Sequence, residues 1–192
     1  YQIKRPNLNM ETYDETQVMQ LLQEPLTRRK AFEIIVRKYR EPLYWKIRRI
    51  VLSHDDADDV LQNCLMKAWN NLGDFRNESK LSTWLFRIAI NESIDFLRRN
   101  KNDKNLVADS DDVNITNKLM ADEYFDGDEM QLKLTVAISK LPEVQRAVFT
   151  MRYYDDMKYS EMSKVLHTTE GALKASYHLA VKKITDFFHN ND

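Results

Sequence analysis

Apolar residues recur every three or four positions along most of the chain, the spacing that places them on one face of an α-helix. Residues 26–51, 53–72 and 82–99 carry three such patterns. Helical spacing returns at residue 131 and continues through further stretches to residue 187. With only 3 glycines and 4 prolines in 192 residues, the chain has few turn formers for hairpins. The sequence therefore predicts an all-α protein.

Several residues are predicted to interrupt or bound these helices. Pro42 lacks an N–H group and is expected to kink or restart the first helix. Ser53 and Asp55 are candidate N-caps of the second helix, and Gly73 is a candidate stop after it. Pro142 suits the first position of a later helix.

Four large apolar side chains are assigned to the core. Val144 and Val181 continue the apolar stripes of their helices, and Trp45 and Trp69 are assigned there because buried tryptophans are commoner than functional ones.

Residues 82–99 combine a wide apolar arc with a narrow polar stripe of Thr83, Arg87, Asn91 and Arg98, edged by Trp84. A helix with so wide an apolar arc must be mostly buried. Its thin basic stripe is either a binding surface or four chance polar residues that face water.

Charge divides the chain into blocks. The net charge is +6 over residues 26–101, −7 over residues 102–132 and +2 over residues 133–192. Two basic blocks around an acidic one indicate two polyanion-binding modules on a solvated connector, although two ordinary solvated surfaces remain the alternative. The connector is weakly periodic, so we predict a flexible acidic linker with one short helical patch at residues 115–125. The predicted organisation is an N-terminal tail, a helical domain, the linker and a second helical domain, at residues 1–25, 26–101, 102–130 and 131–192.

The second domain ends in the layout of a helix-turn-helix, a short helix and a longer one separated by the residues HTT. Thr169 is a candidate N-cap of the longer helix, whose core stripe includes Leu173 and Ile184. Small and basic residues on the opposite face suit entry into a major groove. The candidate DNA contacts are Thr169, Gly171, Ala172, Lys174, Ala175, His178, Leu179 and Lys182. A plain antiparallel helix pair with a solvated outer face is the alternative.

Several classes of chemistry find no support in the sequence. The acidic run at residues 55–59 lacks the alternating ligands and central glycine of a calcium loop, so we assign it to helix capping. We find no metal-ligand spacing, phosphate loop or nucleophile elbow, and expect no metal, no cofactor and no enzyme activity. Cys64 is the only cysteine, which rules out an intrachain disulfide. No membrane-spanning run or signal-peptide pattern is found, so a cytoplasmic protein without membrane insertion is expected.

Two stretches resemble a known family, the bacterial RNA polymerase sigma factors of the small extracytoplasmic-function class. The first resembles the polymerase-binding and promoter-melting domain, and reads DDADDVLQNCLMKAWNNLGDFRNESKLSTWLFRIAINESIDFLRR. The second resembles the reader of the minus-35 element, and reads LPEVQRAVFTMRYYDDMKYSEMSKVLHTTEGALKASYHLAVKKI. Both occur in the family's order and at its separation, which makes the resemblance specific.

The resemblance implies roles for individual residues. The surface that docks on the clamp helices of the polymerase beta-prime subunit corresponds to Asp59, Gln62, Asn63 and Met66, where Asn63 replaces the family's usual glutamate. The minus-10 element would be bound by the loop before residue 82 and the helix after it. These residues are Arg76, Asn77, Ser79, Lys80, Thr83, Trp84, Arg87, Asn91 and Arg98. The polar stripe of that helix suits the melted single strand, because arginine neutralises phosphate, tryptophan stacks on bases and an amide both donates to and accepts from an extruded base.

The sequence departs from the family in the helix-turn-helix. His167 replaces the usual glycine at the end of the short helix, so a strained turn is expected. Leu179 and Val181 occupy positions where arginine is common, which removes phosphate contacts there.

These observations together predict a two-domain sigma factor that recruits core RNA polymerase, through its beta and beta-prime subunits, to promoter DNA. An anti-sigma factor is a further candidate partner. The two domains are expected to be mobile in the free chain and fixed only on polymerase. The rival reading is a dimeric helix-turn-helix regulator that binds an operator; a helical nucleic-acid-processing enzyme would need an acidic cluster that the sequence lacks.

Overall fold

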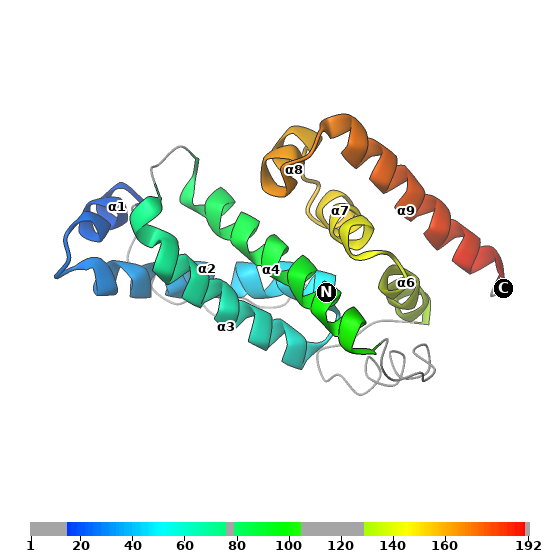
Figure 1. Ribbon diagram of the computed structural model, residues 1–192, viewed down its shortest axis with the longest axis horizontal. Coiled ribbons are helices and arrows are strands. Elements are labelled where there is room, and N and C mark those ends of the chain that lie inside the picture. The colour runs from blue at the N-terminus through cyan, green and yellow to red at the C-terminus, as the bar shows by residue number, and fades with distance from the viewer. Residues whose placement is uncertain (1–14, 76–78, 105–128, 191–192) are drawn as a thin grey trace. The chain divides into compact units, whose positions relative to one another are not determined.

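The computed structural model describes residues 15–75, 79–104 and 129–190, and all regular structure within them is helical (Figure 1). The chain divides into two compact units, Tyr1–Glu41 and Pro42–Asp192. The prediction of an all-α protein is confirmed for the described residues.

The first unit contains helix α1 (Glu15–Gln23) and the beginning of helix α2 (Arg28–Val51). Val18 is buried, and the Thr27 hydroxyl donates to the carbonyl oxygen of Leu21 at 2.7 Å, which fixes the turn between the two helices. Helix α1 was not predicted from the sequence, since it lies within the predicted N-terminal tail. The stretch is only nine residues long, although Val18, Leu21 and Leu22 do recur at helical spacing.

Helix α2 continues through Pro42 without a break, so the prediction of a restart there was wrong. Leu43 and Ile47, which follow Pro42, are completely buried, and this burial compensates for the hydrogen bond that proline cannot make. Trp45 lies between them in sequence but on the other side of the helix, where it is 40% exposed. Its assignment to the core was therefore also wrong.

Helix α3 (His54–Asn71) begins as the sequence predicts, because the Ser53 side chain accepts a hydrogen bond from the Asp56 N–H at 3.5 Å. Its apolar stripe is buried, the residues being Ala57, Val60, Leu61, Cys64 and Ala68. The helix ends by tightening into a 3-10 turn at Leu72–Asp74. Gly73 does not adopt a left-handed conformation, so it does not act as the predicted stop.

Helix α4 (Leu81–Lys104) packs along α3. The contact contains a buried carboxylate, Glu92, whose Oε1 accepts from the ammonium group of Lys67. Cys64 lies near the Lys67–Glu92 pair, and the charges of both residues affect the pKa of its thiol. Burial raises the pKa of the Cys64 thiol to about 12, with a further upward contribution from Glu92 and a downward one from Lys67.

The predicted acidic linker falls almost entirely outside the described residues, as does its helical patch at residues 115–125. Helix α4 extends to Lys104 and helix α6 begins at Glu129, so both helices reach a little into the span assigned to the linker.

The C-terminal part consists of α6 (Glu129–Ser139), α7 (Glu143–Tyr153), α8 (Tyr159–Leu166) and α9 (Glu170–Asn190). Helix α9 packs against α6, α7 and α8, and Figure 1 shows it running alongside them. Pro142 is the N-cap of α7 rather than its first residue. Val144, in the first turn, is 38% exposed, so its assignment to the core was wrong.

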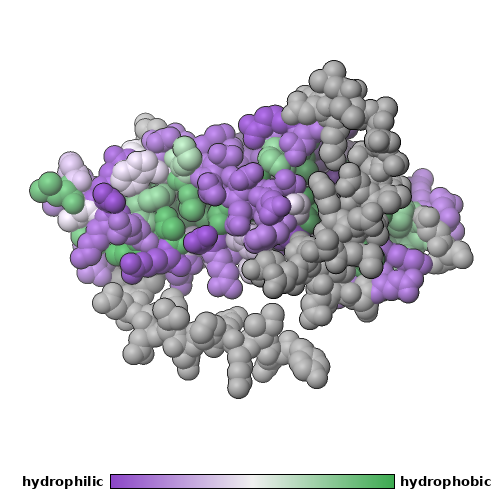
Figure 2. Space-filling view, turned by 90° about the horizontal axis from the view of Figure 1, so that it is seen from below, coloured by the Kyte–Doolittle hydropathy of each residue, from purple (hydrophilic) through white to green (hydrophobic). Residues whose placement is uncertain are grey.

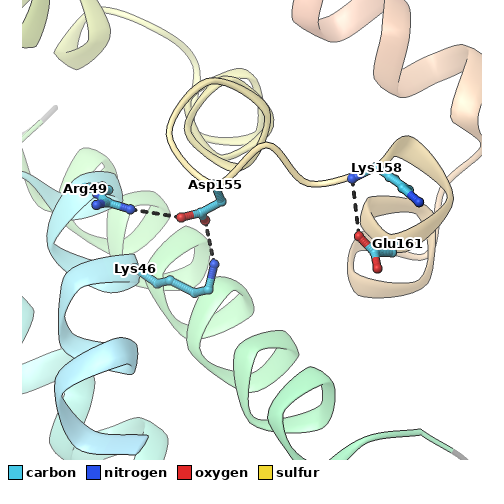
Figure 3. Close-up of polar contacts among 5 residues, drawn as sticks. All are labelled: Lys46, Arg49, Asp155, Lys158 and Glu161. Atoms are coloured by element: carbon cyan, nitrogen blue, oxygen red, sulfur yellow. Dashed lines mark hydrogen bonds and ion pairs between the residues drawn. The ribbon is translucent and has the colours of Figure 1, made fainter.

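The turn between α8 and α9 follows the expected helix-turn-helix layout. His167 adopts the left-handed conformation at the end of α8, with φ 50° and ψ 43°, as its replacement of glycine predicts. The Thr169 hydroxyl then accepts from the Ala172 N–H at 3.2 Å and caps α9. At the start of α8, the Glu161 carboxylate accepts from the Lys158 backbone N–H at 3.3 Å (Figure 3).

A single buried cluster joins helices from both halves of the second unit. Ile50 of α2 and Ile90 and Ile94 of α4 are buried together with residues of α7, α8 and α9. Those residues are Ala147, Val148, Met151, Met162, Val165 and Leu173. The cluster thus contains residues of both predicted helical domains.

Candidate polymerase and DNA interfaces

The proposed polymerase-docking residues lie on one exposed side of α3. Asp59, Gln62, Asn63 and Met66 are all exposed, whereas the opposite side of the helix carries the buried stripe. Met66 is 63% exposed, an unusual position for a large apolar side chain. Trp69, assigned to the core from sequence, is instead 38% exposed on α3. Figure 2 shows that hydrophobic and hydrophilic residues are mixed on the described part of the face it presents.

The proposed minus-10 residues of α4 are half-buried. This holds for Thr83, Trp84, Arg87 and Asn91, while Arg98 is exposed. Trp84 packs against Phe75, with ring centroids 5.2 Å apart. Because Trp84 is only partly covered, part of its surface remains available for stacking.

The polar stripe of α4 is interrupted by an apolar residue. At about 100° per residue, Ile94 falls between Thr83 and Arg87 around the helix, yet it is buried in the shared cluster. The Nε atom of Arg87 is buried and has no hydrogen-bond partner among the described residues. Arg98 is held by Asp95, one turn earlier, at 3.4 Å.

The loop before α4 is only partly described. Ser79 is half-buried and Lys80 is exposed at the start of the helix. Arg76 and Asn77, also predicted to bind the minus-10 element, lie outside the described residues.

The proposed minus-35 residues form one exposed face of α9 and its N-cap. All eight are exposed: Thr169, Gly171, Ala172, Lys174, Ala175, His178, Leu179 and Lys182. The other face of the helix is buried through Leu173, Ala180 and Ile184. Val181 was assigned to that core but is 37% exposed, beside Leu179 at 47%. The Lys174 ammonium lies 5.7 Å from the ring centroid of Tyr159.

One polar contact, made by Asp155, was not predicted from the sequence. Asp155, in the turn after α7, accepts from Lys46 at 2.6 Å and from Arg49 at 2.9 Å (Figure 3). The two basic residues belong to α2, more than a hundred positions earlier. No local pattern in the sequence predicts this contact.

Two family models match the parts of the chain that carry these helices. The Sigma-70 region 2 model matches residues 35–102, and the Sigma-70 region 4 model matches residues 131–184. The ECF RNA polymerase sigma factor SigW of Bacillus subtilis (strain 168) is 31% identical over 156 residues, an alignment that covers 77% of this chain and 83% of SigW. The chain belongs to the ECF RNA polymerase sigma factors.

Other relatives and solved structures extend the comparison. The RNA polymerase sigma-H factor of Pseudomonas aeruginosa is 28% identical over 77% of this sigma factor and 80% of its own length. The fold resembles that of the sigma factor RpoE of Bartonella quintana, solved with the anti-sigma factor NepR, with a TM-score of 0.64 at 21% identity over 83% and 98% of the two chains. It also resembles CnrH, solved with the cytosolic domain of CnrY, with a TM-score of 0.63 at 20% identity over 93% and 99%.

Family membership assigns the chain to promoter-specific initiation of transcription with RNA polymerase. The rival reading, a dimeric operator-binding regulator, is not favoured, because region 2 is matched as well as region 4. In the described part of the chain, no helix is both long enough and apolar enough to cross a membrane.

Proposed function

We propose that this sigma factor docks on core polymerase through α3, reads the minus-35 element with α9 and binds the melted minus-10 strand with α4. The observation that carries the proposal is the two-sided character of α9, which buries Leu173, Ala180 and Ile184 and exposes all eight proposed DNA contacts. Such a helix can enter a major groove without losing its own support.

The deciding experiment is run-off transcription with core polymerase, with and without this chain, on promoters selected from a randomised library. Promoter-dependent transcripts that require the chain support the proposal. Specific duplex binding by a dimer, with no effect on polymerase, would favour the operator-binding alternative.

The chain is proposed to act without covalent chemistry of its own and without a cofactor. Promoter opening would instead draw on contacts made only to the melted strand, which offset the few kcal/mol needed for each unstacked base. Because its proposed partners are core polymerase and promoter DNA, the chain is proposed to act in the cytoplasm. An anti-sigma factor is the proposed regulatory partner.

The docking surface gives the first prediction. Asp59→Lys combined with Gln62→Ala is expected to weaken binding to core polymerase about tenfold or more, equivalent to about 1.4 kcal/mol. Both side chains are exposed, so the fold should be retained. Co-purification and fluorescence titration with core polymerase measure the effect. The matched control is Asp186→Lys on the exposed surface of α9, which introduces the same charge change. Undiminished binding by the folded double variant would remove these residues from the interface.

The recognition helix gives the second prediction, which separates affinity from sequence preference. Lys182→Ala is expected to weaken binding to all promoters alike and to reduce the salt slope by about one unit, because a lysine–phosphate contact carries no sequence information. His178→Ala is expected to alter the preferred minus-35 sequence, because its exposed ring faces the same side as Ala175. Selection from a randomised promoter library compares the two variants. An unchanged preference in His178→Ala would show that α9 is misassigned.

A further inference from the structure

The exposed face of α9 carries one large apolar side chain close to its middle. Leu179 is 47% exposed, and at about 100° per residue it lies about 60° from the direction opposite the buried stripe of the helix. Val181 is also apolar and is 37% exposed, but it lies about 100° from that direction, on the other side. Leu179 therefore projects away from the protein, whereas Val181 lies at the edge of the exposed face.

The two edges of this face are basic. The ammonium group of Lys174 lies 5.7 Å from the ring centroid of Tyr159 on α8, and that of Lys183 donates to the Gln145 side chain of α7 at 3.0 Å. By helical spacing these lysines lie on opposite edges, and Leu179 lies between them. Basic edges suit the two phosphate backbones that border a major groove, so the residues between them face the edges of the bases.

The first turn of α9 leaves room for a close approach. Gly171 is exposed, its φ is not positive, and a β-carbon at this position would meet no packed neighbour in the described part of the chain within 4 Å. Neither packing nor backbone conformation therefore requires a glycine here, although glycine destabilises a helix relative to alanine. Close approach of the backbone to a ligand is another common reason for glycine. Gly171 thus supports an α9 that lies deep enough in the groove for Leu179 to reach a base.

The chemistry of the major groove limits what Leu179 can recognise. A leucine side chain neither donates nor accepts a hydrogen bond, so it makes no favourable polar contact with a phosphate or with the polar edge of a base. The C5 methyl group of thymine is the one apolar group that the base pairs display in this groove. Contact between the two removes apolar surface of both from water, which favours thymine over the other bases.

We propose that Leu179 is a specificity-determining residue of this sigma factor, which reads the methyl group of a thymine in the minus-35 element while the lysines at the edges of α9 contact phosphates. Among the proposed minus-35 contacts, Leu179 is the one large apolar residue. The inference rests on the proposed role of α9 and adds to it which base is selected and through which chemical group.

The test compares promoters that differ by a single methyl group. A minus-35 element is selected from a randomised library with core polymerase carrying this chain, and each thymine on either strand is then replaced by deoxyuridine. Deoxyuridine keeps the hydrogen-bonding groups of thymine and lacks only the methyl group. Replacement at one position is expected to weaken promoter binding about fourfold, the value of burying one methyl-sized group. A selected element without thymine, or no loss at any thymine, would overturn the proposal.

Variants of α9 connect the effect to Leu179. Leu179→Ala is expected to bind the thymine and deoxyuridine promoters equally, and the fold should be retained because the side chain is exposed. Leu179→Met has a similar volume and should keep most of the preference. The matched control is Val181→Ala, which shortens the apolar side chain at the edge of the face and should keep the full preference. A preference that survives Leu179→Ala, or that Val181→Ala also removes, would contradict the assignment.

A converse pair of promoters adds the methyl group instead of removing it. At the thymine identified above, the T·A pair is replaced by C·G, with either cytosine or 5-methylcytosine. The unmodified chain is expected to bind the 5-methylcytosine promoter about fourfold more tightly, because its methyl group occupies the same place in the groove. Leu179→Ala should bind both alike. Equal binding of the two promoters by the unmodified chain would overturn the proposal.

Two further readouts separate this inference from the proposed function. Weaker binding of Leu179→Ala to core polymerase, or an equal loss on thymine and deoxyuridine promoters, would make Leu179 a protein contact or a supporting residue and would overturn methyl recognition. Run-off transcription that does not depend on the minus-35 sequence would overturn the proposed function of α9 itself. Transcription that depends on the minus-35 sequence but is insensitive to the methyl group would overturn only the role of Leu179.

Discussion

Replacing Asn91 by alanine is expected to slow promoter opening about 10- to 100-fold while leaving polymerase binding unchanged. The amide of Asn91 offers a donor and an acceptor one turn from Arg87, and a good two-point contact to a base is worth about 1–3 kcal/mol. That energy is available only when the base has left the duplex, so its loss raises the cost of melting. Permanganate reactivity of thymines in the minus-10 element measures the melted fraction.

A template already mismatched at the minus-10 element separates melting from binding. The defect of Asn91→Ala should shrink on this template, because the unpairing cost has been removed from the reaction. Asn100→Ala serves as the matched control, since this asparagine lies on the opposite side of α4 by helical spacing. Normal melting of the duplex promoter by Asn91→Ala would remove Asn91 from the site.

The ion pair between the exposed Lys67 of α3 and the buried Glu92 of α4 gives the second large effect. Lys67→Met is expected to lower the free energy of unfolding by about 2–4 kcal/mol, because the Glu92 carboxylate, with 7% of its side chain exposed, would lose its charged partner. Urea denaturation measures the change in the unfolding midpoint.

Two comparisons identify the cause of that loss. The double variant Lys67→Met with Glu92→Met should recover most of the stability, because no buried charge remains. Lys164→Met removes the same charge from an exposed position on α8 and should change little. Equal midpoints for Lys67→Met and Lys164→Met would show that the ion pair does not hold the Glu92 carboxylate.

Helix faces were predictable where burial follows the helical repeat. The stripe of α3 from Ala57 to Ala68 and, except for Val181, the buried face of α9 were read correctly, since each depends on spacing within one helix. Trp45 was misassigned because residue type was preferred to position. It lies two residues from buried Leu43 and Ile47, about half a turn away from both, which already predicts exposure.

Contacts between distant segments could not be read in the same way. Asp155 looks like one of many surface acids in the sequence, and nothing near Lys46 or Arg49 marks them as its partners. Ile94 illustrates the same limit on α4, where an apolar residue within a polar stripe has meaning only once α7 and α8 are known to pack there. Local periodicity predicts which face of a helix is buried, but it does not predict which element covers that face.

The position of Cys64 also bears on how the chain can receive a signal. Oxidants and alkylating agents attack the thiolate of a cysteine that water can reach. This thiol is completely buried beneath α3, and with a pKa raised to about 12 it stays protonated at physiological pH. The chain has no second cysteine with which a disulfide could form. The Cys64 thiol is therefore not expected to act as a redox sensor.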